Sequence, residues 1–230
     1  MKLTEQKHKP LNKEKYTCNY SNTHRLMAIG DIHGDVFKLN RLLEQINPTS
    51  NDTLVFLGDY IDRGENSKEV IELLLNLSQC LKCIFLKGNH ENMLLNIKNT
   101  KSKEAYAHWY LSGGDRTLNS YQHFEKIFEL HGKFFENLQN YYQTEDYLFV
   151  HAGIRNGKVL EEQTIDDLLW IRDDFIYGTS KLKQKIIFGH TPFYDPYIAE
   201  DKIGIDTGCG YDNGYLTSII CGKENFITSE

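Results

Sequence analysis

Short apolar runs and amphipathic stretches alternate along the chain, and their spacing predicts its secondary structure. Runs of three to five mostly apolar residues are typical of buried strands and lie at 25–29, 53–57, 83–86, 147–150 and 186–188. Apolar residues at helical spacing lie at 35–46, 66–77 and 164–175, and another helix begins near 89. Because strands and helices alternate through the first hundred residues, the pattern predicts parallel βαβ units.

The remaining segments depart from this alternation. Residues 99–145 are helical in pattern and rich in aromatic residues, and we expect them to form a cap-like region broken at Gly113-Gly114. Residues 197–230 alternate apolar with polar side chains, which predicts a set of antiparallel strands. Residues 1–24 are polar and have no period, so we expect a poorly ordered arm ahead of a single domain at 25–230.

Polar residues with metal-binding chemistry follow each predicted strand. They are Asp31, His33, Asp59, Asp62, Arg63, Asn89, His90, His151 and His190. The carboxyl ends of parallel strands meet at one edge of a sheet, where ligands bind in open α/β folds. Carboxylate, amide and imidazole ligands together suit divalent ions such as Mn, Fe or Zn. The set is large enough for two ions that share an aspartate, which is an arrangement suited to in-line displacement at phosphorus.

The order of these motifs resembles that of the phosphoprotein phosphatase (PPP) family of calcineurin-like metallophosphoesterases, especially its bacterial and phage serine/threonine phosphatases. The motifs are Gly30-Asp31-Ile32-His33-Gly34, Gly58-Asp59-Tyr60-Ile61-Asp62-Arg63-Gly64, Gly88-Asn89-His90-Glu91, His151-Ala152-Gly153 and Gly189-His190. The resemblance covers about residues 25–220. It implies an α/β fold in which two mixed sheets form a four-layer α/β/β/α sandwich.

The resemblance also implies a role for each motif residue. The ligands of the first ion would be Asp31, His33 and Asp59, and those of the second would be Asp59, Asn89, His151 and His190. His90, oriented by Asp62, would act as the general acid. The substrate phosphate would be bound by Arg63, Asn89 and Arg172. Arg116 and Arg155 are weaker alternatives to Arg172.

These roles imply a hydrolase of phosphoesters. We expect its substrate to be phosphoserine or phosphothreonine in a protein or peptide, attacked in line by a hydroxide on two ions, most simply Mn. The alternative is hydrolysis of a dinucleoside polyphosphate such as diadenosine tetraphosphate, because relatives with that activity share the metal ligands. The intact Asp62-Arg63 pair favours the phosphatase. Phosphotyrosine and small phosphoesters stay open as substrates.

Other residues have simpler interpretations. Asp35 is expected to cap a helix and Glu91 to start one or form a local salt bridge. The lone Cys80-x-x-Cys83 pair is expected to pack as thiols, because zinc would need two further ligands. The aromatic residues at 106–110 are expected in a core, and Ile205-Asp206-Thr207-Gly208 is expected to be structural.

Composition narrows the possibilities only slightly. A formal net charge of −6 over 230 residues argues against a nucleic-acid partner. The sequence has no apolar run long enough to cross a membrane, and no apolar stretch follows the first lysines as in a secretory signal. The five cysteines are scattered and odd in number, as expected of reduced thiols in the cytoplasm.

Overall fold

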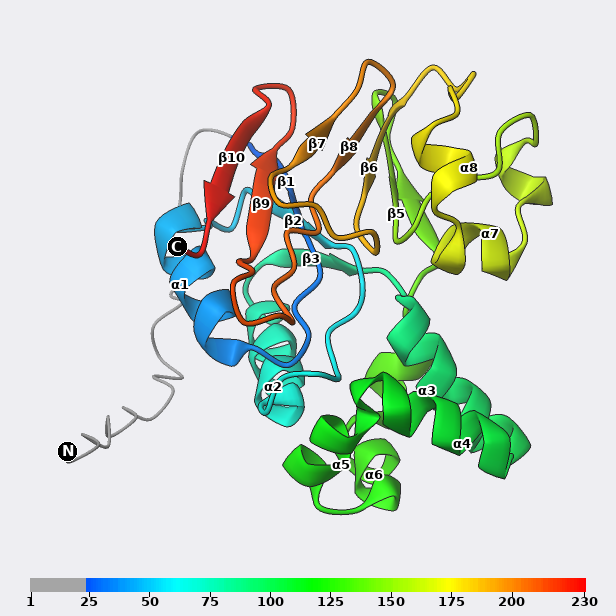
Figure 1. The fold of residues 1–230 in the computed structure, drawn as a ribbon. Coiled ribbons are helices and arrows are strands. Elements are labelled where there is room, and N and C mark those ends of the chain that lie inside the picture. The colour runs from blue at the N-terminus through cyan, green and yellow to red at the C-terminus, as the bar shows by residue number, and fades with distance from the viewer. Residues whose placement is uncertain (1–23) are drawn as a thin grey trace.

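The computed structural model describes residues 24–230, so the arm predicted for residues 1–24 lies outside them except for its last residue. Two five-stranded mixed sheets form the centre of the molecule (Figure 1). The first has the order β10 (Asn225–Thr228), β9 (Thr217–Ile220), β1 (Leu26–Ile29), β2 (Thr53–Phe56) and β3 (Lys82–Phe85). Strands β1, β2 and β3 are parallel, which confirms the predicted βαβ units.

The second sheet is built from the later part of the chain. Its order is β4 (Tyr141–Gln143), β5 (Tyr147–Val150), β6 (Lys185–Phe188), β8 (Lys202–Gly204) and β7 (Tyr197–Ile198). Strands β5, β6 and β8 are parallel, and β4 and β7 pair antiparallel at the two edges. Both sheets therefore align the carboxyl ends of their central strands.

Helices cover the outer faces of the two sheets. Those packed with the first sheet are α1 (Val36–Ile46), α2 (Ser67–Leu77), α3 (Asn89–Thr100), α4 (Lys103–Trp109), α5 (Asp115–Tyr121) and α6 (Phe124–Glu136). A π-helical segment (Tyr110–Gly114) joins α4 to α5. The second sheet is covered by α7 (Ile165–Trp170) and α8 (Asp173–Ile176), after a 3₁₀ turn at Leu160–Glu162 (Figure 1).

The strands alternate their side chains between two buried interfaces. Ala28 and Val55 of the first sheet pack against Phe149 and Ile187 of the second, so these residues form the core between the sheets. Their neighbours along the strands, such as Met27, pack against helices instead. This period of two places one apolar layer between the sheets and one on each outer face. The predicted α/β/β/α sandwich is therefore confirmed.

Three predicted segments differ from the structure. The predicted helix at 164–175 is divided into α7 and α8, because the carbonyl of Leu168 accepts the N–H of Ala152 at 2.9 Å and is not available to continue the helix. Residues 197–230 form two antiparallel pairs in different sheets, and β8 runs parallel to β6. The segment 99–145 is helical only to Glu136, since β4 belongs to the second sheet.

Within residues 24–230, none of the helices combines the length and the apolar character needed to span a bilayer.

Candidate active site

Loops after five strands bring the candidate residues together. Those after β1, β2 and β3 come from the first sheet, and those after β5 and β6 come from the second. Nine non-glycine residues of the described chain have positive φ, and five of them are candidates: His33, Asp59, Asp62, Arg63 and His190. Such backbone conformations cost energy and tend to persist where a site requires them. The loops are therefore shaped to aim these side chains.

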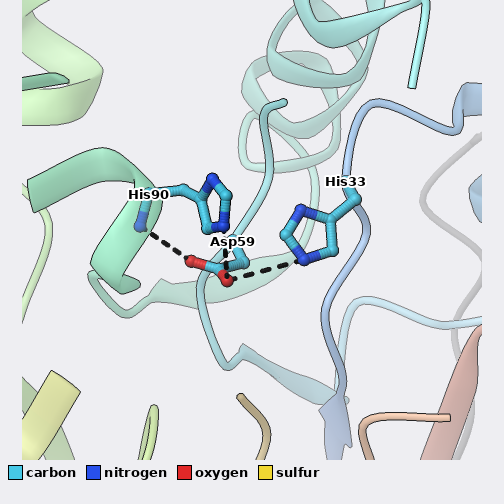
Figure 2. A group of neighbouring side chains, drawn as sticks. All are labelled: His33, Asp59 and His90. Atoms are coloured by element: carbon cyan, nitrogen blue, oxygen red, sulfur yellow. Dashed lines mark hydrogen bonds and ion pairs between the residues drawn. The ribbon is translucent and has the colours of Figure 1, made fainter. Parts of the chain in front are cut away.

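One group of possible ligands contains His33, Asp59 and His90, all of them buried (Figure 2). Oδ2 of Asp59 lies 3.5 Å from Nε2 of His33 and 3.9 Å from Nε2 of His90. Their ligand atoms lie within 4.8 Å of one another. His90, which sequence analysis assigns to acid catalysis, thus shares a cluster with two predicted metal ligands.

A second group contains Asp59, His151 and His190, so Asp59 is common to both. Its other oxygen, Oδ1, lies 3.5 Å from Nε2 of His151. Oδ1 of Asn89 lies 2.9 Å from a ring nitrogen of His151 and 2.9 Å from one of His190. Asp31 belongs to neither group, but its carboxylate accepts the backbone N–H of His190 at 3.0 and 3.2 Å. All the predicted ligands are therefore neighbours.

The histidines fit a divalent ion. Nδ1 of His33 lies 3.1 Å from the carbonyl of Ile61, and Nδ1 of His151 lies 2.9 Å from that of Leu57. Each Nδ1–H donates to its carbonyl, which leaves the lone pair of Nε2 facing Asp59. Burial lowers the pKa of both rings and keeps them neutral, as ligands must be. Nε2 of His190 is buried without a hydrogen-bond partner, which also suits a metal ligand.

The buried carboxylates also favour bound cations. Burial raises the pKa of Asp31, and the charges of Asp206 and Asp59 raise it further. Burial also raises the pKa of Asp206, to about 6. For Asp59 burial acts in the same direction, but the surrounding histidines, His151 foremost, lower its pKa overall. Three buried carboxylates that repel one another are compensated well by cations.

Comparison with known proteins decides the family. A profile of the calcineurin-like phosphoesterases matches residues 24–221. The chain belongs to this family. It is a metallophosphoesterase, an enzyme that hydrolyses phosphoesters, and its motifs fit the PPP branch.

Named relatives have two different activities. PrpE from Oceanobacillus iheyensis, an asymmetrical bis(5′-nucleosyl)-tetraphosphatase, is 26% identical over 89% of this chain and 91% of its own length. Serine/threonine-protein phosphatase 2 from Escherichia coli is 32% identical over 80% of this chain and 87% of its own. A crystal structure attributed to a diadenosine tetraphosphatase shares the fold, with a TM-score of 0.68 at 20% identity over 90% of this chain and 94% of its own.

The phosphoesterase also brings the predicted catalytic residues together. Nδ1 of His90 lies 2.7 Å from Oδ2 of Asp62, and both side chains are buried. The guanidinium of Arg63 lies beside two of the histidines, with NH1 2.8 Å from Nε2 of His33 and NH2 3.2 Å from Nε2 of His90. One nitrogen of His90 is thus held by a carboxylate while the other faces Arg63.

Arg172 lies at the break between α7 and α8 and is exposed. Its positive charge is close enough to lower the pKa of His190, an effect that adds to those of burial and of His151. The two weaker alternatives have partners elsewhere. Arg116 pairs with Glu65, and Arg155 pairs with Asp167 and Asp174. The effect of Arg172 on a predicted ligand, and the ion pairs of the other two arginines, therefore favour Arg172.

Glu91 caps a helix, as the sequence predicts, and also binds the loop after β2. It accepts the backbone N–H of Gly88 at 3.0 Å and so caps α3 as expected. It also accepts the N–H groups of Asp59 at 2.9 Å and Tyr60 at 2.8 Å. Burial raises its pKa to about 8, and the charge of Asp59 adds to this. One carboxyl group therefore joins the loops after β2 and β3, a link that no sequence pattern indicates.

The predicted cap at Asp35 and the helix break at Gly113 are confirmed, but among the aromatic residues expected in a core, His108 and Tyr110 are exposed. The side chain of Asp35 accepts the N–H of Lys38 at 2.9 Å and caps α1. Cys80 and Cys83 pack against the core, and within residues 24–230 neither forms a disulfide. Gly113 breaks the helical path with a φ of 104°, and Trp109 is fully buried. The structure adds one group at this break, because the carbonyl of Gly113 accepts the N–H of Arg63 at 3.0 Å.

Proposed function

We propose that this phosphoesterase removes phosphate from phosphoserine and phosphothreonine in proteins. The pairing of His90 with Asp62 carries the proposal. A serine or threonine side chain leaves as an alkoxide, which is a poor leaving group and requires a proton in the transition state. An imidazole held at Nδ1 by a buried carboxylate can deliver that proton from Nε2. The relative with serine/threonine phosphatase activity supports the same substrate class.

The chain's residues suit two divalent ions, and we propose Mn²⁺. The residues that would hold the ions are Asp31, His33, Asp59, Asn89, His151 and His190, and Asp59 is common to both groups of ligands. When bound, such ions act as Lewis acids on the phosphoryl oxygens and lower the pKa of bound water. The scattered cysteines of residues 24–230 form no disulfide with one another, which is consistent with action in the cytoplasm.

The protein's own side chains would bind the phosphoryl group and protonate the leaving oxygen. Arg63 and Arg172 would bind the equatorial oxygens of the phosphoryl group, where charge develops. Nε2–H of His90 would be transferred to the leaving oxygen as the bond to phosphorus breaks. Asp62 would keep the Nδ1–H throughout, so that the ring stays aimed and its positive charge is compensated.

The test of this proposal must separate an acid from a ligand, because His90 shares a cluster with His33 and Asp59. Phosphate release from a phosphoserine peptide would be measured for the wild type, His90→Asn and Asp59→Asn, together with bound Mn²⁺ per chain. We expect His90→Asn to keep two ions and to lose about 10²–10⁴ in kcat. Asp59→Asn should lose both ions and nearly all activity. If His90→Asn loses the ions, His90 is a metal ligand and its proposed role as the general acid is wrong.

The second arginine has a direct test. Arg172→Ala should weaken competitive inhibition by inorganic phosphate about tenfold or more, since a charged hydrogen bond is lost. Arg155→Ala is the matched control, because its guanidinium is bound by Asp167 and Asp174. Equal inhibition constants for both variants would place the second phosphate-binding group elsewhere.

A second substrate class is favoured by two exposed rings at the site. Trp170 is 37% exposed, and its ring centroid lies 6.0 Å from that of His190. Tyr211 is 53% exposed, with Cζ of Arg63 5.1 Å from its ring centroid. Nucleobases stack on such rings, and the PrpE relative hydrolyses a dinucleotide. If dinucleoside tetraphosphates are substrates, Trp170→Ala should raise KM for diadenosine tetraphosphate about tenfold and leave KM for phenyl phosphate unchanged.

A further inference from the structure

Asp62 is bound by more groups than the proposed acid His90. The indole N–H of Trp109 donates to both of its carboxylate oxygens, at 2.9 Å to Oδ2 and 3.2 Å to Oδ1. The hydroxyl of Thr117 donates to Oδ1 at 2.6 Å. Trp109 and Thr117 lie in α4 and α5, 47 and 55 residues along the chain from Asp62. The helical segment that adjoins the site therefore supplies two of the donors that fix this carboxylate.

Thr117 also fixes the backbone of Asp62. Its Oγ1 accepts the N–H of Asp62 at 2.9 Å and lies 2.8 Å from Oγ of Ser67. Because the hydrogen of Thr117 is given to Oδ1, Ser67 is the donor in this last pair. Asp62 has a φ of 72°, a conformation that costs energy outside glycine. One hydroxyl thus holds both ends of Asp62 in this conformation.

The packing explains why these donors are well placed. Trp109 and Thr117 are fully buried, and a Cβ on Gly114 would lie 2.4 Å from the indole ring. A glycine is therefore required at this position for the ring to reach Asp62. The hydrogen bond from the N–H of Arg63 to Gly113 ties the same segment to the neighbouring loop residue.

We propose that Trp109 and Thr117 are positioning residues for proton delivery, because they hold Asp62, and through it His90, in the orientation for the leaving group. The inference rests on the proposed acid role of His90. The two side chains would contact neither substrate nor ions. Without them Asp62 could turn about its side-chain torsions, Nδ1–H of His90 would lose its fixed acceptor, and Nε2–H would point less often at the leaving oxygen.

The test uses leaving groups of different quality. Phenyl phosphate needs a proton on its leaving oxygen, whereas 2,4-dinitrophenyl phosphate leaves well without one. We expect Thr117→Val to lower kcat about tenfold for phenyl phosphate and by less than about twofold for 2,4-dinitrophenyl phosphate. Thr117→Ser keeps the hydroxyl and should restore the wild-type ratio of the two rates. Trp109→Phe removes the N–H donor and should act in the same direction as Thr117→Val.

The matched control is Tyr121→Phe, in the same helix as Thr117, which removes a buried hydroxyl that bonds to His131 at 2.6 Å. It should leave the ratio unchanged, and thermal unfolding of every variant would show that each is folded. Equal losses on both substrates for Thr117→Val, or no rescue by Thr117→Ser, would overturn the positioning role. If His90→Asn lowers kcat equally for phenyl phosphate and 2,4-dinitrophenyl phosphate, His90 is not the general acid. That result would contradict the proposed function rather than the positioning role.

Discussion

Glu91 shows how one side chain can organise the ligands around it. Its carboxyl group accepts N–H groups from the loop that carries Asp59 and from the loop that carries Asn89. It is fully buried, so no water replaces those bonds if the side chain is changed. The positive φ of Asp59 depends on such support, because an isolated chain would avoid that conformation.

Glu91→Gln should therefore weaken metal binding without removing a ligand. A carboxamide has one acceptor oxygen, and its NH₂ would face a backbone N–H, so the loop after β2 would lose part of its support. We expect about 10–100-fold weaker Mn²⁺ binding by titration calorimetry, as found for groups that orient metal ligands. Glu104→Gln, on an exposed helix start, is the control and should bind normally. Wild-type affinity in Glu91→Gln would show that the loops hold their shape without it.

At the residue scale, the sequence predicts only those site residues that lie within motifs. Asp62 and His90 follow from the loops after β2 and β3, because each motif ends an apolar run. Trp109 and Thr117 carry no such signal. They come from a segment whose aromatic residues predict a core, and the core prediction is right for Trp109 without revealing its bond to Asp62. A contact across 47 residues depends on tertiary packing that a single sequence does not show.

At the scale of elements, the buried carboxylate of Asp52 joins the amino ends of two strands, away from the carboxyl ends that carry the site. Asp52 precedes β2 and accepts hydrogen bonds from the backbone and guanidinium of Arg25, which precedes β1, and from Thr49. The same guanidinium donates to the carbonyls of Ile46 and Asn47 at the end of α1, each at 3.1 Å. This cluster fixes where the two central strands of the first sheet begin.

Asp52→Asn should destabilise the protein in a pH-dependent way. Burial acts to raise the pKa of Asp52, but the bonds from Arg25 and Thr49 lower it overall. Its contribution is therefore complete above the unfolded pKa of about 3.9 and is lost as pH falls through the lower folded pKa. We expect urea unfolding to show a loss of about 1–3 kcal/mol at pH 7. The gap to wild type should narrow below about pH 3. Exposed Asp146→Asn should change little, and a gap that widens in acid would contradict the account.

The break between α7 and α8 marks the limit of prediction at the scale of elements. The apolar spacing from Leu168 to Phe175 continues at a helical period, so the sequence favours one helix. The helix ends because the carbonyl of Leu168 bonds to Ala152 on the loop after β5. The strands were easier to predict, because buried runs such as 147–150 are bounded by polar residues on both sides. A tertiary hydrogen bond overrides a local period, and Arg172 lies at the resulting break between the two helices.

At the scale of the molecule, the proposed metal ligands link the two sheets. Asp31, Asp59 and Asn89 follow strands of the first sheet, whereas His151 and His190 follow strands of the second. Ions that bind only the folded state add stability, about 2.7 kcal/mol at a concentration of 100 Kd. Removing them with EDTA should therefore lower Tm by about 5–10 °C for a chain of this size.

The control for this prediction is Asp59→Asn, which lacks the shared ligand and should show no further shift with EDTA. An equal Tm for the wild type with and without chelator would mean that the ions do not join the sheets.

The overall architecture was the most predictable part of the molecule. The alternation of strands and helices indicates α/β, and the family resemblance carried by the ordered motifs implies the second sheet, which no periodicity requires. The substrate was less predictable, because the named relatives differ in what they hydrolyse. Trp170 and Tyr211, the exposed rings on which a dinucleotide is proposed to stack, are ordinary aromatic positions in the sequence.

The most direct test of the central claim is a comparison of kcat/KM for the Mn²⁺-loaded protein with a phosphoserine peptide and with diadenosine tetraphosphate. The account predicts that kcat/KM is at least about tenfold higher for the peptide, since the His90–Asp62 pair is suited to a leaving group that needs a proton. A kcat/KM that is higher for the dinucleotide would contradict it and assign the site to nucleotide hydrolysis.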